Sequence, residues 1–295
     1  MLQPRVKVLA PSIRALLREL RRLVARRSSY KFFMKSVIPP ADTQAAAEVI
    51  RTMRFTKNID PVLQNGPSGK RLTVIAPHCD DEAIGPGGTI SMAVADGAEV
   101  NVIYLTPTTN KPNETLVGEA KASAACMGCS VRFMSHPVRN IPVDDKAAQD
   151  FGEVLLERRP STIMLPFLLD DHDDHRRANQ LLLQASRVVG LPKDIQIWAY
   201  QVYSVVPGNV VVDITMSMER KAEAIRMYES QLARRDWVHY ALGVNAMNVR
   251  LLHSENRPRY VEAFFVVPLS EYLDICELYF DRDVSQCYDE PNYQA

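Results

Sequence analysis

Short apolar runs rich in β-branched residues recur along the chain, and stretches of helical periodicity separate them. The runs predict buried strands at residues 72–76, 99–105, 131–135, 161–166, 197–203, 210–214 and 260–267. The periodicity over 91–96 and 176–190 predicts helices after the first and fourth of these strands. Alternating strands and helices favour an α/β fold, here a three-layer α/β/α sandwich with a mostly parallel, Rossmann-like sheet.

Two clusters of acids and histidines follow two of the predicted strands. Residues 77–82 read Pro-His-Cys-Asp-Asp-Glu directly after the first strand, and residues 172–175 read His-Asp-Asp-His after the fourth strand and a short loop. Ligands of an open parallel sheet bind outside the carboxyl ends of its strands. The sequence therefore predicts that both clusters meet at one edge of the sheet. A glycine-rich turn over 84–90 follows the first cluster, and it lacks the GxGxxG pattern of dinucleotide-binding proteins.

The residue types in the two clusters suit a mononuclear metal hydrolase. Hydrolytic zinc sites commonly have three nitrogen or oxygen ligands from the protein plus a water, whose pKa falls to about 7. His78, Asp81 and His175 could supply these three ligands. Asp174 could orient an imidazole from behind the ligands.

Simpler interpretations exist for each cluster taken alone. An Asp-Asp-Glu sequence is usually a solvated turn. The acidic run over 170–174 could be a surface loop or a calcium site, because carboxylates suit hard cations. The conjunction of the two clusters at two strand ends, in a chain with only six histidines, favours the metal hydrolase.

The two clusters resemble the signatures of the PIG-L/LmbE-like family of zinc-dependent de-N-acetylases, which ordinarily read Pro-His-Pro-Asp-Asp-Glu and His-x-Asp-His. The resemblance implies that His78, Asp81 and His175 bind Zn²⁺, or another divalent transition metal in its place. It implies that Asp80 is the general base, and that His172 stabilises the tetrahedral intermediate or protonates the leaving amine.

The activity implied by this resemblance is hydrolysis of the acetyl amide of an N-acetylated amino sugar or N-acetylglucosamine conjugate by metal-activated water. A small-molecule or lipid-linked amino sugar is the expected substrate. Two alternatives stay open: an amidase that acts on a non-sugar amide, and a non-catalytic metal-binding interaction module. Retention of Asp80 and His172 favours catalysis, since a structural zinc site would be closed by four ligands.

Two positions depart from the family pattern. Cys79 replaces the usual proline between ligand and base, either as a small buried apolar residue or as a thiol beside the metal. If Glu119 is the family's helix glutamate, Leu116 stands where many relatives carry a substrate-holding arginine. The loops 106–115 and 138–145 are expected to set substrate specificity.

The five cysteines are odd in number and scattered, and Cys126 and Cys129, although spaced as CxxC, are expected to be buried structural thiols. Reduced cysteines fit a cytoplasmic protein. The sequence shows neither a signal peptide nor an apolar stretch of transmembrane length.

The zero net charge conceals a basic N-terminal arm. Residues 1–40 contain ten Lys and Arg against one Glu, and apolar residues recur at helical spacing over 13–24. Such a helix could lie on an anionic membrane through residues 13–27, pack on an acidic partner, or dock on its own domain. Nucleic acid is not an expected partner, because no basic motif is interleaved with aromatics. Residues 1–70 are thus predicted to form an arm, a helix and a linker, and residues 71–295 the catalytic domain.

Overall fold

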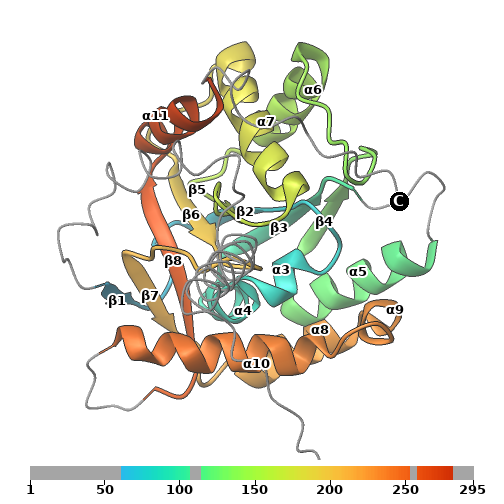
Figure 1. The fold of residues 1–295 in the computed structure, drawn as a ribbon, viewed down its shortest axis with the longest axis vertical. Coiled ribbons are helices and arrows are strands. Elements are labelled where there is room, and N and C mark those ends of the chain that lie inside the picture. The colour runs from blue at the N-terminus through green and yellow to red at the C-terminus, as the bar shows by residue number, and fades with distance from the viewer. Residues whose placement is uncertain (1–60, 107–113, 253–257, 282–295) are drawn as a thin grey trace, which may run out of the picture.

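The computed structural model describes residues 61–106, 114–252 and 258–281 (Figure 1). The basic arm, including residues 13–27, and the helix predicted after it lie outside the described residues. The described chain forms an eight-stranded sheet in the order β1-β7-β8-β6-β5-β2-β3-β4. The strands are β1 (Val62–Gln64), β2 (Arg71–Ala76), β3 (Glu99–Tyr104), β4 (Ser130–Phe133), β5 (Thr162–Pro166), β6 (Gln196–Tyr200), β7 (Val210–Asp213) and β8 (Val261–Pro268).

Helices cover both faces of the sheet, which confirms the predicted three-layer α/β/α sandwich (Figure 1). One face carries α6 (Asp145–Arg158), α7 (Asp173–Val189) and α11 (Leu269–Phe280). The other carries α4 (Gly87–Ala95), α5 (Glu114–Met127), α8 (Met218–Arg226) and α10 (Trp237–Asn248). The short elements are α3 (Asp81–Ile84), α9 (Glu229–Leu232) and η3 (Val249–Leu251). In the part of the chain that the structure describes, no helix is long and apolar enough to cross a membrane.

The seven predicted strands are all present, and the differences lie at their ends and at one edge. Strand β6 ends at Tyr200, so 201–203 belong to the following loop. Strand β1 was not predicted, because it lies in the segment that was expected to be a linker. Its three residues are exposed and pair in parallel with β7. Helix α7 begins at Asp173, three residues earlier than expected, so the second cluster forms its first turn.

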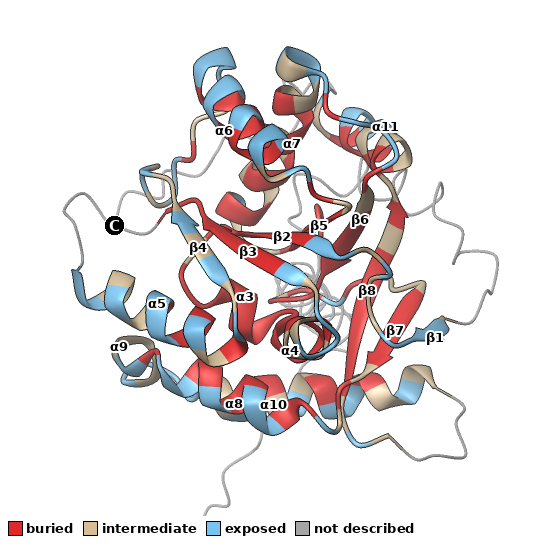
Figure 2. Ribbon diagram, turned by 180° about the vertical axis from the view of Figure 1, so that it is seen from behind, coloured by how far each residue is buried: buried red, intermediate tan, exposed pale blue. Residues whose placement is uncertain are grey.

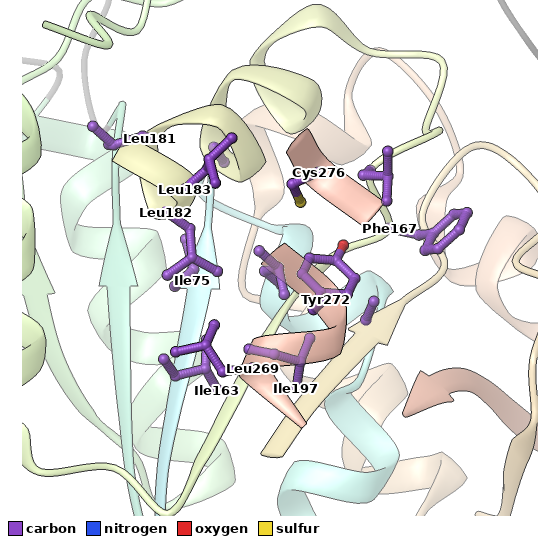
Figure 3. Packing of buried hydrophobic residues seen from close by; sticks show 14 of the residues in the cluster. Ile75, Ile163, Phe167, Leu181, Leu182, Leu183, Ile197, Leu269, Tyr272 and Cys276 are labelled. Carbon is purple, nitrogen blue, oxygen red and sulfur yellow. The ribbon is translucent and has the colours of Figure 1, made fainter. Parts of the chain in front are cut away.

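Between its edge strands β1 and β4 the sheet is buried on both faces, which explains the continuous apolar runs in the sequence (Figure 2). Ile75, Ile163 and Ile197 lie on β2, β5 and β6 and pack beneath α7 and α11, beside Tyr272 (Figure 3). All three isoleucines are fully buried. Burial of one such side chain contributes about 1.5–3 kcal/mol, so the central strands hold their positions tightly.

The strand order reverses between β2 and β5. The chain runs from β2 outward through β3 to β4, and then returns to place β5 on the other side of β2. All pairs in this part of the sheet are parallel, whereas β8 is antiparallel to β6 and β7. A crevice opens outside the carboxyl ends of the strands at such a reversal. Both sequence clusters follow the two strands that flank it.

A buried ion pair fixes the glycine-rich turn beside this crevice. Lys221 Nζ of α8 lies 2.6 Å from Glu262 Oε1 of β8, and both side chains are almost fully buried. The Glu262 carboxylate also accepts backbone hydrogen bonds from Gly88 and Thr89 at the start of α4. A carboxylate is favourable there because it neutralises the positive end of the helix dipole. A Cβ on Gly88 would lie 2.8 Å from Ile214, so the turn requires glycine at this position.

We expect Lys221→Met to lower the free energy of unfolding by about 3–5 kcal/mol, because it leaves the Glu262 carboxylate buried without its cation. The double variant Lys221→Met/Glu262→Gln should recover most of this loss, since no unpaired charge then remains. Urea unfolding curves of the two variants and the wild type measure the difference. Equal stabilities of wild type and Lys221→Met would contradict this role of the ion pair.

Candidate metal centre and active site

The first cluster forms a tight turn between β2 and α3. Asp80 has a backbone φ of 123°, a conformation that residues other than glycine rarely adopt. Hydrogen bonds hold it there: its N–H donates to Glu82 Oε2, and its carbonyl accepts from the N–H groups of Ala83 and Ile84. The strained turn places consecutive side chains of the cluster in different directions.

The second cluster is the amino end of α7. His172 is the N-cap residue, and its Nδ1 accepts a hydrogen bond from the Asp174 N–H at 3.1 Å. His175 lies in the first turn and is fully buried. The side chain of Asn179 donates to the carbonyls of Pro166 and His175, and so ties α7 to the end of β5. The cap and this tie set the direction in which both histidines enter the crevice.

Three predicted ligands meet at one point. His78 Nδ1 and His175 Nε2 each lie 3.2 Å from Asp81 Oδ2, and 3.3 Å from each other. A tetrahedral metal with bonds of about 2.0–2.1 Å separates its donor atoms by about 3.3 Å. The second oxygen of Asp81 is buried without a hydrogen-bond partner within the described residues. The two nitrogens and one oxygen therefore fit a divalent transition metal, and leave a fourth position for water or substrate.

His172 lies close enough to complete a cluster of three histidines. Donor atoms of His78, His172 and His175 all lie within 4.8 Å of one another. However, a neutral imidazole that accepts through Nδ1 carries its proton on Nε2, and so has no lone pair left for a metal. This hydrogen bond favours His78, Asp81 and His175 over the three histidines as the candidate ligands.

Electrostatics in the site favours a cation. Burial would lower the pKa of His78, but hydrogen bonds to Asp174 and Asp81 outweigh it and raise the pKa to about 9. Burial likewise opposes the charged form of His175, yet the charges of Asp81 and Asp170 raise its pKa to about 10. The same histidines hold the pKa of the Asp81 carboxyl far below its usual range, against the effect of burial. A metal bound there would displace the two imidazole protons.

Two further carboxylates contact the imidazoles of the candidate ligands His78 and His175. Asp174 Oδ2 lies 3.0 Å from His78 Nε2 and also accepts the N–H of Arg139. Asp170 Oδ1 lies 3.0 Å from His175 Nδ1. The sequence predicted the location of Asp174 but not the function of Asp170, which nothing distinguishes from its neighbours in the acidic run 170–174. A carboxylate in contact with the second ring nitrogen of a metal-binding histidine keeps the ring in one tautomer and one orientation.

Asp170→Asn should weaken metal affinity about 10- to 100-fold, because the amide cannot hold His175 as the carboxylate does. Competition with a fluorescent chelator measures the affinity. Asp173→Asn is the matched control: its side chain is 76% exposed and pairs only with Arg176 among the described residues. Equal affinity of both variants would show that Asp170 does not support the metal site.

The remaining predicted catalytic residues flank the three ligands. Asp80 is 8% exposed, and no hydrogen bond within the described residues uses its carboxylate. Burial raises its pKa well above the usual value, and the charge of Asp81 adds to the rise. His172 and His78 have ring centroids 4.5 Å apart. Burial and the positive charges of His78 and His175 lower the pKa of His172 to about 4, which keeps this ring neutral.

Comparison with known proteins agrees with this geometry. Residues 73–186 match the family model described as PIG-L: GlcNAc-PI de-N-acetylase. These residues form a PIG-L family domain. Over 195 residues the chain is 29% identical to the diacetylchitobiose deacetylase of Thermococcus kodakarensis, covering 57% of this chain and 72% of that protein. It is thus homologous to deacetylases.

Solved structures share the fold of the PIG-L domain. The N,N'-diacetylchitobiose deacetylase of Pyrococcus horikoshii superposes with a TM-score of 0.60 and 24% identity, over 78% of this chain and 94% of that one. GalB of Pseudomonas putida, a 4-carboxy-2-hydroxymuconate hydratase, superposes with a TM-score of 0.58 and 19% identity, over 66% and 95% of the two chains. A hydratase on the same fold means that the fold alone does not specify deacetylation.

The two departures from the PIG-L family pattern have different surroundings. Cys79 is 2% exposed and packs in the apolar cluster below the first motif. Burial raises the pKa of its thiol, as do the nearby charges of Glu82 and Asp80, so no thiolate forms beside the site. Leu116 packs against the same apolar cluster. Glu119 accepts hydrogen bonds from both the N–H and the hydroxyl of Ser230, and so joins α5 to α9.

Among the other cysteines that the structure describes, none forms a disulfide. Cys126 and Cys129 are partly exposed rather than buried as expected, but partial burial raises the pKa of both thiols, that of Cys129 to about 12, so neither has the acidity of a redox pair. Of the predicted specificity loops, residues 107–113 lie outside the described residues. The loop 138–145 reaches the site through the Arg139 N–H, which lies 2.7 Å from Asp174 Oδ2.

Proposed function

We propose that this chain is a metal-dependent N-deacetylase of acetylated amino sugars or N-acetylglucosamine conjugates, with Zn²⁺ as the metal or another divalent transition ion in its place. The observation that carries the proposal is the open triangle of His78, Asp81 and His175, flanked by the unengaged carboxylate of Asp80 and the neutral ring of His172. The homology to deacetylases supports the reaction type. The similarity to a diacetylchitobiose deacetylase supports a sugar substrate.

A divalent ion held by the three ligands would lower the pKa of a water molecule to about 7 and polarise the amide carbonyl. Asp80 takes one proton from this water as its oxygen forms a bond to the carbonyl carbon. The Nε2–H of His172 donates to the carbonyl oxygen, which becomes negative as the carbon becomes tetrahedral. When the carbon–nitrogen bond breaks, Asp80 returns the proton to the amine, and acetate and a free amino sugar are released.

The neutral state of His172 supports one of the two roles that the family resemblance implies, stabilisation of the tetrahedral intermediate. Its Nδ1 is occupied by the Asp174 N–H, and its pKa of about 4 leaves no second ring proton at neutral pH. The ring can therefore donate a hydrogen bond to the oxyanion but has no additional proton to give to the leaving amine. Protonation of the amine then falls to Asp80, which holds the proton that it took from the water.

An acetate-release screen tests the proposed function. Metal-loaded protein is incubated with N-acetylglucosamine, with N,N'-diacetylchitobiose and with N-acetylated amino acids as non-sugar amides, and both acetate and free amine are measured. We expect equal amounts of the two products from the sugar substrates, and loss of the reaction when a chelator is added. Release from the non-sugar amides alone would instead identify an amidase of another specificity.

A further inference from the structure

A fully buried carboxylate lies behind the strained turn of the first cluster. Glu82 is the last residue of that cluster and the second residue of α3, and no part of its side chain is exposed. It is not one of the three candidate metal ligands. Within the described residues no lysine or arginine forms an ion pair with it. A carboxylate buried in this way is costly, so hydrogen bonds must satisfy its oxygens.

Three donors occupy the two oxygens of Glu82. The hydroxyls of Tyr228 and Ser123 donate to Oε1 at 2.7 Å and 2.9 Å. The Asp80 N–H donates to Oε2 at 3.2 Å. The carboxylate cannot rotate away from the Asp80 backbone without also lengthening the bonds at Oε1. The two hydroxyls therefore fix the oxygen that holds the Asp80 N–H.

These hydroxyls come from elements far from the cluster in the sequence. Ser123 lies within α5, and Tyr228 lies between α8 and α9; both side chains are fully buried. The Tyr104 hydroxyl, at the end of β3, lies 3.3 Å from that of Tyr228. Glu119 of α5 accepts two hydrogen bonds from Ser230, which ties the segment after Tyr228 to α5. The position of the Tyr228 hydroxyl is thus set by β3 and α5 together.

The position of the Asp80 carboxylate depends on this support. A backbone φ of 123° persists only where the surroundings hold it. The carboxylate itself makes no hydrogen bond within the described residues, so the backbone of the turn sets where it lies. Misplacement of a catalytic group by about 1 Å can lower a rate about 100-fold. The bond to Glu82 is therefore important for the position of the proposed base.

We propose that Glu82 is a positioning residue for Asp80, and that the Tyr228 and Ser123 hydroxyls hold it in place. This proposal rests on the proposed function, and it assigns a role in the reaction to two residues outside both sequence clusters. A carboxylate that only stabilises the fold predicts a different result. Loss of its hydrogen bonds would then lower the stability of the protein and leave the rate of each folded molecule unchanged.

The first test removes one hydroxyl at a time. We expect Tyr228→Phe and Ser123→Ala each to lower kcat about tenfold, with KM within about a factor of two and the metal retained. Tyr200→Phe is the matched control, because this tyrosine is also fully buried and its hydroxyl donates to the Ile75 carbonyl instead. It should lower the melting temperature as Tyr228→Phe does, without the loss of kcat. Equal kcat values in the two tyrosine variants would overturn the proposal.

The second test does not depend on catalysis. NMR of protein with isotopically labelled aspartate follows the exchange of the Asp80 N–H with solvent deuterium. The Asp170 N–H, which donates to the Phe167 carbonyl, is the internal reference. We expect the Asp80 N–H to exchange about tenfold faster in Tyr228→Phe than in Tyr200→Phe, and the reference to exchange equally in both.

The two readouts separate the positioning role from the proposed function. Equal exchange of the Asp80 N–H in the two tyrosine variants would overturn the role of Glu82, even where acetate is released. Wild-type protein that releases acetate from no sugar would refute the proposed function. Faster exchange in Tyr228→Phe would in that case still support the hold of Glu82 on the turn.

Discussion

Asp80→Asn should lower kcat by about two to four orders of magnitude while the protein keeps its metal. The reason is that a positioned general base contributes a factor of this size, and asparagine cannot accept the proton of the attacking water. Asparagine has nearly the same shape, and it tolerates a positive φ better than most residues do, so the strained turn at φ of 123° should persist. Steady-state kinetics and elemental analysis of the same preparation measure both properties.

The exposed Asp173→Asn substitution is the control for this variant, because it also removes one negative charge from the clusters. It should leave kcat within about a factor of two. If Asp80→Asn keeps its metal and its full rate, Asp80 is not the base. If it loses the metal, the carboxylate is a ligand and the assignment of the three ligands is wrong.

His172→Asn should lower kcat by about two to three orders of magnitude, again with the metal retained. In the proposed mechanism the neutral ring donates its Nε2–H to the oxyanion, and removal of one such donor typically has an effect of this size. Asparagine is a favourable N-cap residue, so it preserves the first turn of α7 and the position of His175. His172→Ala lacks this cap, and should lose about 1 kcal/mol of stability in addition to the rate.

The metal content of His172→Asn separates two arrangements of the site. In the wild type, donor atoms of His172, His78 and His175 lie within 4.8 Å of one another, as they would in a three-histidine metal centre. Retention of the metal with loss of rate supports a role in the transition state. A fall in metal content together with the rate would assign His172 to the metal instead.

The fold was predictable because its central strands are buried on both faces and read as unbroken apolar runs. β1 was not, since its three exposed residues carry no alternation, and its place is set by pairing with a strand about 150 positions later in the chain. The antiparallel direction of β8 was not predicted either. No periodicity within a strand reveals the direction of its neighbour.

The site was predictable as far as its residues lie in the two clusters. The structure brings His78, Asp81 and His175 together because β2 and β5 are neighbours, and it places Asp80, His172 and Asp174 around them. Asp170 was indistinguishable from other acids in its run, although it contacts His175. Tyr203 comes from a separate segment, so only the folded chain shows that its ring stacks on His175 and His172.

The most direct test of the metal centre is the metal content of active protein, measured by elemental analysis of the wild type and of Asp81→Ala. Our assignment predicts one divalent transition ion per chain in the wild type, little in the variant, and acetate release that a chelator abolishes and added metal restores. Wild-type protein that releases acetate without a transition metal would contradict it.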